Sequence, residues 1–489
     1  SNICTAQVLL AIISGMYALF HGPTGLKNIA LRIHNYTKDL ARKIGERGHE
    51  IITDNHSFFD TIVVKLSNMK IKDLKARAIK HNFNLMYHEN GLVGISLDEK
   101  TSRKEIDDIA TLFENELTAD YRETIFKPNR KSSILSHPIF HSINSETEML
   151  RYINKLEKRD LSLNYSMIPL GSCTMKLNAT VEMIPISWPE FNSIHPFAPL
   201  DQAKGYTEII DELEEMLYKV TGFDAVSFQP NSGAQGEYAG LLSIREYHKA
   251  NNSQRNICLI PESAHGTNPA SAIMAGLKVV IVKCDENGNI DFTDLKNKVS
   301  EAGDKLSSLM VTYPSTHGVF EHNIDEICDL IHQNGGLVYM DGANLNAMVG
   351  VCKPGKFGAD VMHINLHKTF CIPHGGGGPG MGPICVNEKL KPHLPKHKFT
   401  DDTFTYSVSS SPFGSASILL ISYIYMKLMA SKGLLKASQV AILSANYMAK
   451  RLENDYSILY KGHSGLNAHE FIVDCREFKN SANITNEDI

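Results

Sequence analysis

The segment Val361-Met362-His363-Ile364-Asn365-Leu366-His367-Lys368-Thr369-Phe370 joins a short apolar run directly to a polar loop that contains a lysine. Five similar runs of apolar and β-branched residues precede it, separated by segments long enough to form helices. Near-continuous apolar strands that alternate with helices are typical of a mostly parallel sheet covered on both faces. The six expected strands are 225–228, 257–260, 279–282, 309–312, 337–340 and 361–364.

Polar residues directly after these runs are candidates for a site, because such sheets bind ligands beyond the carboxyl ends of their strands. His265 follows the second run, Asp341 the fifth and Lys368 the sixth. Each has an ordinary interpretation when taken alone: a loop histidine, a helix-capping acid and a solvated lysine.

The segment Gln229–Gly236 follows the first run and places small residues at the beginning of a helix. Backbone N–H groups at such a position can bind a phosphate. The alternative is an ordinary turn with a helix cap. The segment is neither a P-loop, which needs Gly-Lys-Ser/Thr, nor a G-x-G-x-x-G fingerprint.

A phosphate loop, an acid and a lysine at different strand ends of one sheet together meet the requirements of pyridoxal phosphate. The amine of Lys368 would form a Schiff base with the aldehyde. Asp341 would hold the pyridine nitrogen protonated, so that the ring accepts electrons from the substrate. His265 would supply a ring to stack on the exposed face of the cofactor. This reasoning does not specify which substrate bond breaks.

The longer segment Asn365–Pro383, with four consecutive glycines, strongly resembles the cofactor-lysine segment of glycine decarboxylase, the P-protein of the glycine cleavage system. Gly171–Asn178, Gln229–Gly236 and Pro261–Ala270 resemble further motifs of that family. The resemblance covers essentially the whole chain and implies an α/β fold of the pyridoxal-phosphate-dependent transferase type (fold type I), a large domain flanked by small α+β domains. The length of the motifs argues against an aminotransferase, a cysteine desulfurase or an aromatic amino-acid decarboxylase.

The resemblance also implies a role for each matching residue. Lys368 would carry the cofactor and Asp341 would face the pyridine nitrogen. Ala343 and His265 would pack under and over the ring, and Thr316 would hydrogen-bond the ring hydroxyl or the substrate. The remaining cofactor-binding residues, at the phosphate and beside the lysine, would be Ser232, Gly233, Ala234, Gln235 and His367.

The implied activity is that of glycine dehydrogenase (aminomethyl-transferring), which decarboxylates glycine and transfers the aminomethyl group to the lipoyl arm of the H-protein. His367, His317 and Asn344 are candidates for placing the glycine carboxylate. The loop Gly171–Asn178 and the glycines after Lys368 would line the path of the lipoyl arm, with a wide turn as the alternative for the glycines. The carrier could dock on four lysines, which could equally be an ordinary solvated surface: Lys389, Lys391, Lys396 and Lys398.

Two other functions stay open. The chain could be a non-catalytic scaffold, like the cofactor-free half of the same family, or another pyridoxal-phosphate-dependent lyase or transaminase of this fold. The presence of both Lys368 and Asp341 at strand ends argues against the scaffold.

The chain also repeats itself over a long period. Ser1–Leu10 aligns with Ser411–Leu420 at an offset of 410 residues, and Gly25 aligns with Gly433 at an offset of 408. The resembling family has two tandem halves, so both ends of this chain are expected to be truncation points. The segment alone is expected to be poorly soluble and to show little turnover. The expected parts are the closing small domain of the first half, a connector with the N-terminal arm of the second half, the large cofactor domain, and the start of the second small domain: 1–112, 113–200, 201–410 and 411–489.

The composition excludes several classes of protein. With 43% hydrophobic residues, 21% charged residues and a net charge of -5, the 489-residue chain has no bulk field to attract nucleic acid or anionic lipid. Its nine cysteines form no C-x-x-C pair, so neither a disulfide framework nor a metal site is expected. The apolar stretch Ala6–Phe20 indicates neither a signal peptide nor a membrane span. The resemblance implies homodimers of full-length chains, in the bacterial cytoplasm or the mitochondrial matrix.

Overall fold

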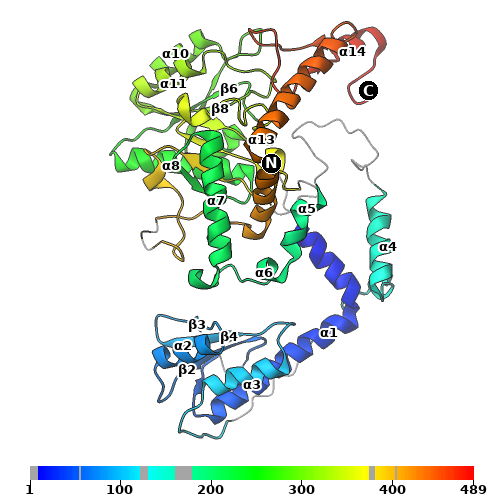
Figure 1. Cartoon of the computed structure of the whole chain (residues 1–489), viewed down its shortest axis with the longest axis vertical. Helices are drawn as coiled ribbons and strands as arrows, with labels where there is room; N and C mark the ends of the chain where they lie inside the picture. The colour runs from blue at the N-terminus through cyan, green and yellow to red at the C-terminus, as the bar shows by residue number, and fades with distance from the viewer. Residues whose placement is uncertain are drawn as a thin grey trace. The chain divides into compact units, whose positions relative to one another are not determined.

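The computed structural model describes residues 9–53, 57–121, 130–159, 179–373, 380–401, 403 and 405–489. These residues belong to two compact units, a smaller one within 11–162 and a larger one that holds everything described from residue 179 onward (Figure 1). The larger unit contains the predicted α/β sheet, and the smaller unit has an α+β fold.

The larger unit is organised around a seven-stranded sheet with the order β5-β11-β10-β9-β8-β6-β7. All six predicted strands are present, and their pairing is parallel wherever two of them are neighbours. The seventh strand, β11, was not predicted, and it pairs antiparallel with both β10 and β5. The strand bounds are β5 (Ala225–Ser227), β6 (Ile257–Pro261), β7 (Lys278–Val282), β8 (Leu306–Thr312), β9 (Leu337–Asp341), β10 (Val361–His363) and β11 (Ile384–Val386).

Helices cover both faces of this sheet, as buried apolar strands require. Val338 and Met340 of β9 share one core with residues of α7, α10, α11 and α13. Leu337 and Tyr339 point to the opposite face and share a second core with residues of α8 and α9. The helix bounds are α7 (Lys204–Thr221), α8 (Gly233–Ala250), α9 (Asn268–Met274), α10 (Phe292–Ala302), α11 (Ile324–Gln333) and α13 (Ala416–Leu452).

Short elements complete the larger unit. The one that bears on the site is α12, a single turn after β10. A two-stranded antiparallel ladder of β12 and β13 follows α13. The bounds are α5 (Thr180–Met183), α6 (Pro189–Asn192), α12 (Leu366–Thr369), β12 (Ser457–Ile458), β13 (Val473–Asp474) and α14 (Arg476–Ala482).

The smaller unit packs helices on a four-stranded antiparallel sheet with the order β1-β2-β4-β3. Leu40 of α1, Ile62 of β2 and Leu74 of α2 are fully buried in its core. A capping box of Ser102 and Glu105 begins α3. The bounds are α1 (Leu9–Glu46), β1 (Glu50–Ile51), β2 (Thr61–Lys65), α2 (Ile71–Lys80), β3 (Met86–Tyr87), β4 (Leu92–Ser96), α3 (Arg103–Leu112) and α4 (Glu146–Glu157).

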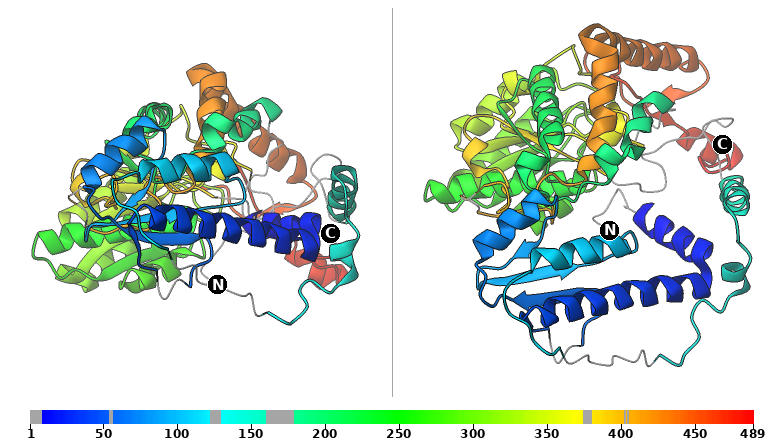
Figure 2. Two further views of the ribbon diagram at one scale, coloured as in Figure 1. Left: turned by 90° about the horizontal axis from the view of Figure 1, so that it is seen from below. Right: turned by 60° about the horizontal axis from the view of Figure 1, so that its bottom comes forward.

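The described parts of the two segments related by the sequence repeat have the same local structure. Each is a long helix with one kink, at Gly22 in α1 and at Ala430 in α13 (Figure 2). Each helix is followed by an antiparallel strand pair, with Ile51 opposite Val64 in one and Ile458 opposite Val473 in the other. This correspondence supports the duplication, while the bounds of the four expected parts stay a prediction.

By length and composition alone, α1 and α13 could also cross a bilayer. The most apolar window is 11% buried in α1 and 39% buried in α13. Long core helices pass the same test, so this is weak support for a membrane span.

Candidate active site

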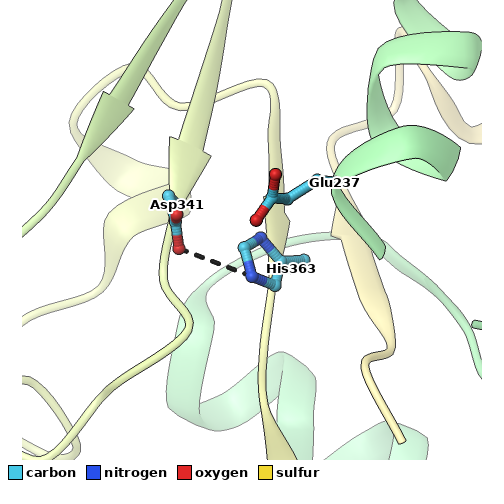
Figure 3. A group of neighbouring side chains, drawn as sticks. All are labelled: Glu237, Asp341 and His363. Carbon is cyan, nitrogen blue, oxygen red and sulfur yellow. Dashed lines mark ion pairs between the residues drawn. The ribbon is translucent and has the colours of Figure 1, made fainter. Parts of the chain in front are cut away.

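The candidate site lies at the carboxyl ends of three neighbouring strands. The parallel register sets Asp341 of β9 beside Thr312 of β8 on one side and His363 of β10 on the other. Asp341 and His363 are 2% and 1% exposed, and His363 Nε2 lies 3.4 Å from Asp341 Oδ1 (Figure 3). The register of the sheet therefore builds a buried acid–imidazole pair.

Asp341 is held as a carboxylate by several donors. Asn268 Nδ2 donates to Oδ2 at 3.0 Å, and the backbone N–H of Ala343 donates to Oδ1 at 3.0 Å. Burial alone would raise the pKa of Asp341. His363, these two hydrogen bonds and the charge of Lys368 outweigh burial and hold the pKa below its ordinary value. A buried anion at this position can face a cationic ring nitrogen.

Lys368 lies on α12, directly after the strand that carries His363. The residue is only 9% exposed. Its charge acts on Asp341 and also contributes to lowering the pKa values of His265 and His363, both of which are lowered chiefly by burial. The predicted lysine, acid and stacking histidine are thus brought into one electrostatic neighbourhood. The adjacent His367 is 5% exposed.

His265 is half-buried in the loop between β6 and α9. Its backbone N–H donates to Thr312 Oγ1 at 3.1 Å, which ties the loop to the end of β8. Its Nδ1 lies 2.7 Å from Thr267 Oγ1, and Thr267 Oγ1 lies 2.5 Å from Glu237 Oε1. The imidazole is therefore oriented through a hydroxyl by a buried acid of α8, Glu237, which was not among the predicted site residues.

The predicted phosphate loop is the N-terminus of α8. Ser232 is its N-cap, and Ser232 Oγ accepts from the backbone N–H of Gln235 at 3.1 Å. The side chain of Gln235 bridges the loop to a second segment, since it accepts from the N–H of Asn231 and donates to the carbonyl of Val408. These contacts fit the helix-cap interpretation, and Ser232, Ala234 and Gln235 also line a pocket.

That pocket, of about 690 Å³, is rich in hydroxyl groups. Serine hydroxyls and helix N–H groups are the donors that phosphate prefers. The run 407–410 was not predicted to contribute, although three of its four residues are serines. The lining residues are Ser232, Ala234, Gln235, Tyr238, Ser271, Met274, Ser407, Val408, Ser409 and Ser410.

Glycine is required where the phosphate loop meets the lysine segment. A Cβ at Gly233 would lie 2.3 Å from Asn365 Oδ1, and a Cβ at Gly382 would lie 2.2 Å from the carbonyl oxygen of Ser232. Neither clash could be relieved without moving backbone or a buried side chain. These close approaches hold the phosphate loop against α12, which carries Lys368.

The structure ties two further predicted residues to the framework of the site. Ala343 N–H binds Asp341, and the carbonyl of Ala343 accepts from the N–H of Asn365 at 3.3 Å. Thr316 Oγ1 donates to the carbonyl of Ser263 at 2.9 Å. Thr316 therefore fixes the loop that carries His265, and its oxygen lone pairs stay available to another donor.

Other predicted residues have different partners. His317 Nδ1 contacts the carbonyl of Gly288 at 3.1 Å and its ring stacks on Tyr460 at 4.2 Å. Asn344 Oδ1 accepts from the N–H of Asn346 at 2.9 Å. These contacts occupy His317 Nδ1 and Asn344 Oδ1, and the role of both residues in placing the carboxylate stays a prediction. The loop Gly171–Asn178 and the four glycines after the lysine lie outside the described residues.

The suggested docking lysines are largely paired with acids. Lys391 Nζ lies 3.3 Å from Glu388, and Lys396 Nζ lies 2.9 Å from Asp401. Lys389 Nζ lies 4.0 Å from Asp360. This pattern favours an ordinary solvated surface.

The segment after β12 contributes a residue that the sequence did not point to. Ala468 N–H donates to the carbonyl of Gly318 at 2.8 Å, which brings the next residue, His469, toward the Thr316 loop. The side chain of His469 is 4% exposed. Burial, with a contribution from the charge of Lys368, lowers the pKa of His469 to about 4. A lone loop histidine offers no pattern from which this position could be predicted.

The described residues fit pyridoxal phosphate. A buried lysine, a buried carboxylate that already accepts two hydrogen bonds, an imidazole and a hydroxyl-lined helix N-terminus come from four different strand ends of one sheet. The fold and this donor set are those of the type I pyridoxal-phosphate-dependent enzymes. A solved glycine decarboxylase (P-protein) of the glycine cleavage system, in inhibitor-bound form, has the same fold, with a TM-score of 0.52 at 15% identity over 80% of this chain and 82% of that chain.

The chain belongs to the glycine cleavage system P-protein family, whose model matches residues 1–113 and 123–397. A second model, described as the glycine dehydrogenase C-terminal domain, matches residues 437–489. The chain is similar over its full length to the glycine dehydrogenases (decarboxylating) of Thermosynechococcus vestitus, at 57% identity, and Enterobacter sp., at 53%. It spans 52% of the length of each of these relatives. The resemblance expected from the sequence motifs is confirmed.

Proposed function

We propose that this chain carries the pyridoxal-phosphate site at which glycine is decarboxylated, with transfer of the aminomethyl group to the lipoyl arm of the H-protein. The observation that carries the proposal is the buried Lys368 within the field of the buried carboxylate of Asp341. Membership of the P-protein family supports glycine as the substrate and the lipoylated H-protein as the partner.

In this proposal each residue has a physical role. Lys368 binds the cofactor covalently, and its burial keeps the amine away from bulk water. Asp341 faces the pyridine nitrogen and stabilises its positive charge, while His265 stacks on the ring and Ala343 packs beneath it. Thr316 hydrogen-bonds the ring hydroxyl or the substrate. His367 borders the lysine on α12. The phosphate is held at the N-terminus of α8 by Ser232, Gly233, Ala234 and Gln235.

The bound cofactor would supply an electron sink for the pair left behind when carbon dioxide leaves. The protein's part is to hold the ring nitrogen opposite a fixed anion and to exclude water around Lys368. Pre-organised charge of this kind is effective because the site is buried and does not reorganise during the reaction.

Assembly and location follow from the same proposal. We expect full-length chains to form homodimers, and the bacterial relatives favour the cytoplasm, with the mitochondrial matrix as the alternative. Neither nucleic acid nor a membrane is expected as a partner, given the net charge of -5.

Two measurements on the purified intact protein that contains this segment test the proposal. Borohydride reduction of the cofactor-loaded protein, followed by peptide mass spectrometry, should place the reduced pyridoxyl group on Lys368. The same protein should exchange labelled carbon dioxide into the carboxyl group of glycine only when lipoylated H-protein is present. Labelling of another lysine would contradict the site, and an equal rate without H-protein would contradict the partner.

A further inference from the structure

Glu237 lies on the first turns of α8 and faces the predicted pyridinium acid. It is 3% exposed, and one ligand atom each of Glu237, Asp341 and His363 lies within 4.8 Å of the others (Figure 3). The alternation of β9 explains the contact, because Asp341 points to the same face of the sheet as Tyr339, the face that α8 covers. The motifs of the sequence gave Glu237 no role.

Two buried carboxylates at this distance cannot both be charged without a large penalty. Asp341 has the charge-stabilising surroundings: an amide, a backbone N–H and the nearby Lys368. The hydrogen-bonding neighbours of Glu237 are neutral: Ser271 Oγ lies 2.6 Å from Oε2, Thr267 Oγ1 lies 2.5 Å from Oε1, and Asn268 is the third. Burial and the charge of Asp341 raise the pKa of Glu237 to about 7. The pair therefore keeps its proton on Glu237.

The hydrogen bonds of Thr267 lead to the same assignment. Its hydroxyl has one proton and two close contacts, Glu237 Oε1 and His265 Nδ1. The backbone N–H of Thr267 also points to His265 Nδ1 at 3.2 Å, which makes that nitrogen an acceptor. If the hydroxyl of Thr267 donates its proton to His265 Nδ1, it has none left for Glu237. The contact with Glu237 Oε1 then needs a proton on the carboxyl group, which donates to the hydroxyl oxygen of Thr267.

His363 completes the arrangement from the other side. The hydroxyl of Tyr339, which is fully buried, lies 2.7 Å from His363 Nδ1. Burial raises the pKa of Tyr339 well above its ordinary value, so the hydroxyl stays protonated and donates to Nδ1. The Nε2 proton of a neutral His363 then points toward Asp341.

We propose that Glu237 is a positioning residue that carries a proton in the resting site and orients His265 through Thr267, while Asp341 remains the anion. The inference rests on the proposed function for the roles of Asp341 and His265. The groups that face Glu237 are Asp341 and Tyr339 from β9, His363 from β10, the neutral Ser271 and Asn268 from α9, and, through Thr267, His265.

A metal ion is the competing occupant of the three side chains. The atoms are already used within the cluster, since both Glu237 oxygens contact hydroxyl groups, both Asp341 oxygens accept N–H groups, and His363 Nδ1 faces Tyr339. A shared proton therefore explains the geometry better than a cation does.

The first test measures the stability of the cofactor-free protein against pH. A folded-state pKa above the unfolded value means that the folded protein binds about one more proton than the unfolded chain between pH 4.5 and 7. The contribution of Glu237 is therefore fully present below the unfolded pKa and is lost as pH rises through 7. In Glu237→Gln the urea midpoint should therefore decrease less than in the wild type as pH rises from 4.5 to 7. Glu246→Gln on the same helix is the matched control and should keep the wild-type slope.

Equal slopes for the wild type and Glu237→Gln would overturn the proposal. So would one bound metal ion per chain that is lost in Glu237→Gln, measured by elemental analysis. Because this test needs neither cofactor nor activity, its failure would leave the proposed function untouched.

The second test measures the affinity for pyridoxal phosphate at pH 6.5. Glu237→Gln keeps a neutral side chain with a donor and should bind within about threefold of the wild type, whereas Glu237→Ala leaves Thr267 and Ser271 without their partner and should bind about tenfold or more weakly. Thr267→Ser should bind like the wild type and Thr267→Val like Glu237→Ala. A Gln variant as weak as the Ala variant would mean that the charge of Glu237 is needed, and would overturn the proposal.

Discussion

Gly22 and Ala430 hold the same backbone conformation at equivalent positions of two helices, 408 residues apart in the chain. Gly22 has φ 58° and ψ -179°, and Ala430 has φ 49° and ψ -179°. This region is essentially restricted to glycine, and another residue is strained there by about 1–3 kcal/mol. Glycine in place of Ala430 should therefore raise the stability, and alanine in place of Gly22 should lower it.

Ala430→Gly should stabilise the protein by about 1 kcal/mol, because removal of the Cβ relieves more strain than the added flexibility of the unfolded chain costs. The measurement is the urea midpoint of the purified protein. Ala437→Gly, at an exposed helical position of α13, is the matched control and should destabilise by about 1 kcal/mol. Equal destabilisation by both changes would contradict the strain at Ala430.

Gly22→Ala should destabilise the smaller unit by about 2 kcal/mol, since the residue takes a positive φ and its Cβ would lie 2.8 Å from the carbonyl oxygen of Phe140. Gly15→Ala on the same helix has nothing within 4 Å and should be neutral or stabilising by up to about 1 kcal/mol. Thermal unfolding followed by circular dichroism would separate the two. A neutral Gly22→Ala would argue against the kink.

Much of the fold could be predicted from the sequence because each central strand is a continuous apolar run. The strand β11 could not, since three residues after a glycine-rich segment carry too little pattern to separate a strand from a turn. Its antiparallel pairing between β10 and β5 depends on contacts from distant parts of the chain.

The candidate site was predictable to the extent that its residues directly follow strands. Asp341, Lys368 and His265 were found in this way. Glu237 was not, because it lies within a helix and meets Asp341 only through the packing of α8 on one face of the sheet. His363 lies within a predicted strand, and only the alternation of β10 sets it on the same face as Val361, toward α8. A polar residue inside a helix or strand can be assigned to a site only when the packing of that element is known.

Asp341→Asn should retain measurable cofactor binding but lower the rate of glycine decarboxylation about a hundredfold or more, because the ring nitrogen loses its buried counter-charge. The measurement is carbon dioxide exchange at saturating glycine, with cofactor content determined in parallel. Asp329→Asn, an exposed acid of α11, is the matched control and should be fully active. Near-normal turnover of Asp341→Asn would refute the electrostatic role of this residue.

Ser232→Ala should weaken pyridoxal phosphate binding about tenfold and lower stability by about 1 kcal/mol, since Ser232 is both the N-cap of α8 and a lining residue of the hydroxyl-rich pocket. The two contributions can be separated with Ser102→Ala, which removes the N-cap of α3 in the smaller unit. That variant should lose similar stability and keep the full cofactor affinity. Unchanged affinity in Ser232→Ala would favour the cap as the sole role of this serine.

Tyr339→Phe should destabilise the protein by about 1–3 kcal/mol, because it leaves the buried Nδ1 of His363 without the hydroxyl at 2.7 Å. His363 is then expected to move its proton or turn, and Asp341 loses a fixed neighbour at 3.4 Å. The readout beyond stability is the pH dependence of the absorbance of the lysine-bound cofactor, which should shift in Tyr339→Phe. Tyr218→Phe, a half-buried tyrosine of α7 that contacts Glu214, is the matched control and should leave that absorbance unchanged. A stability loss with an unshifted absorbance profile would show that Tyr339 serves packing alone.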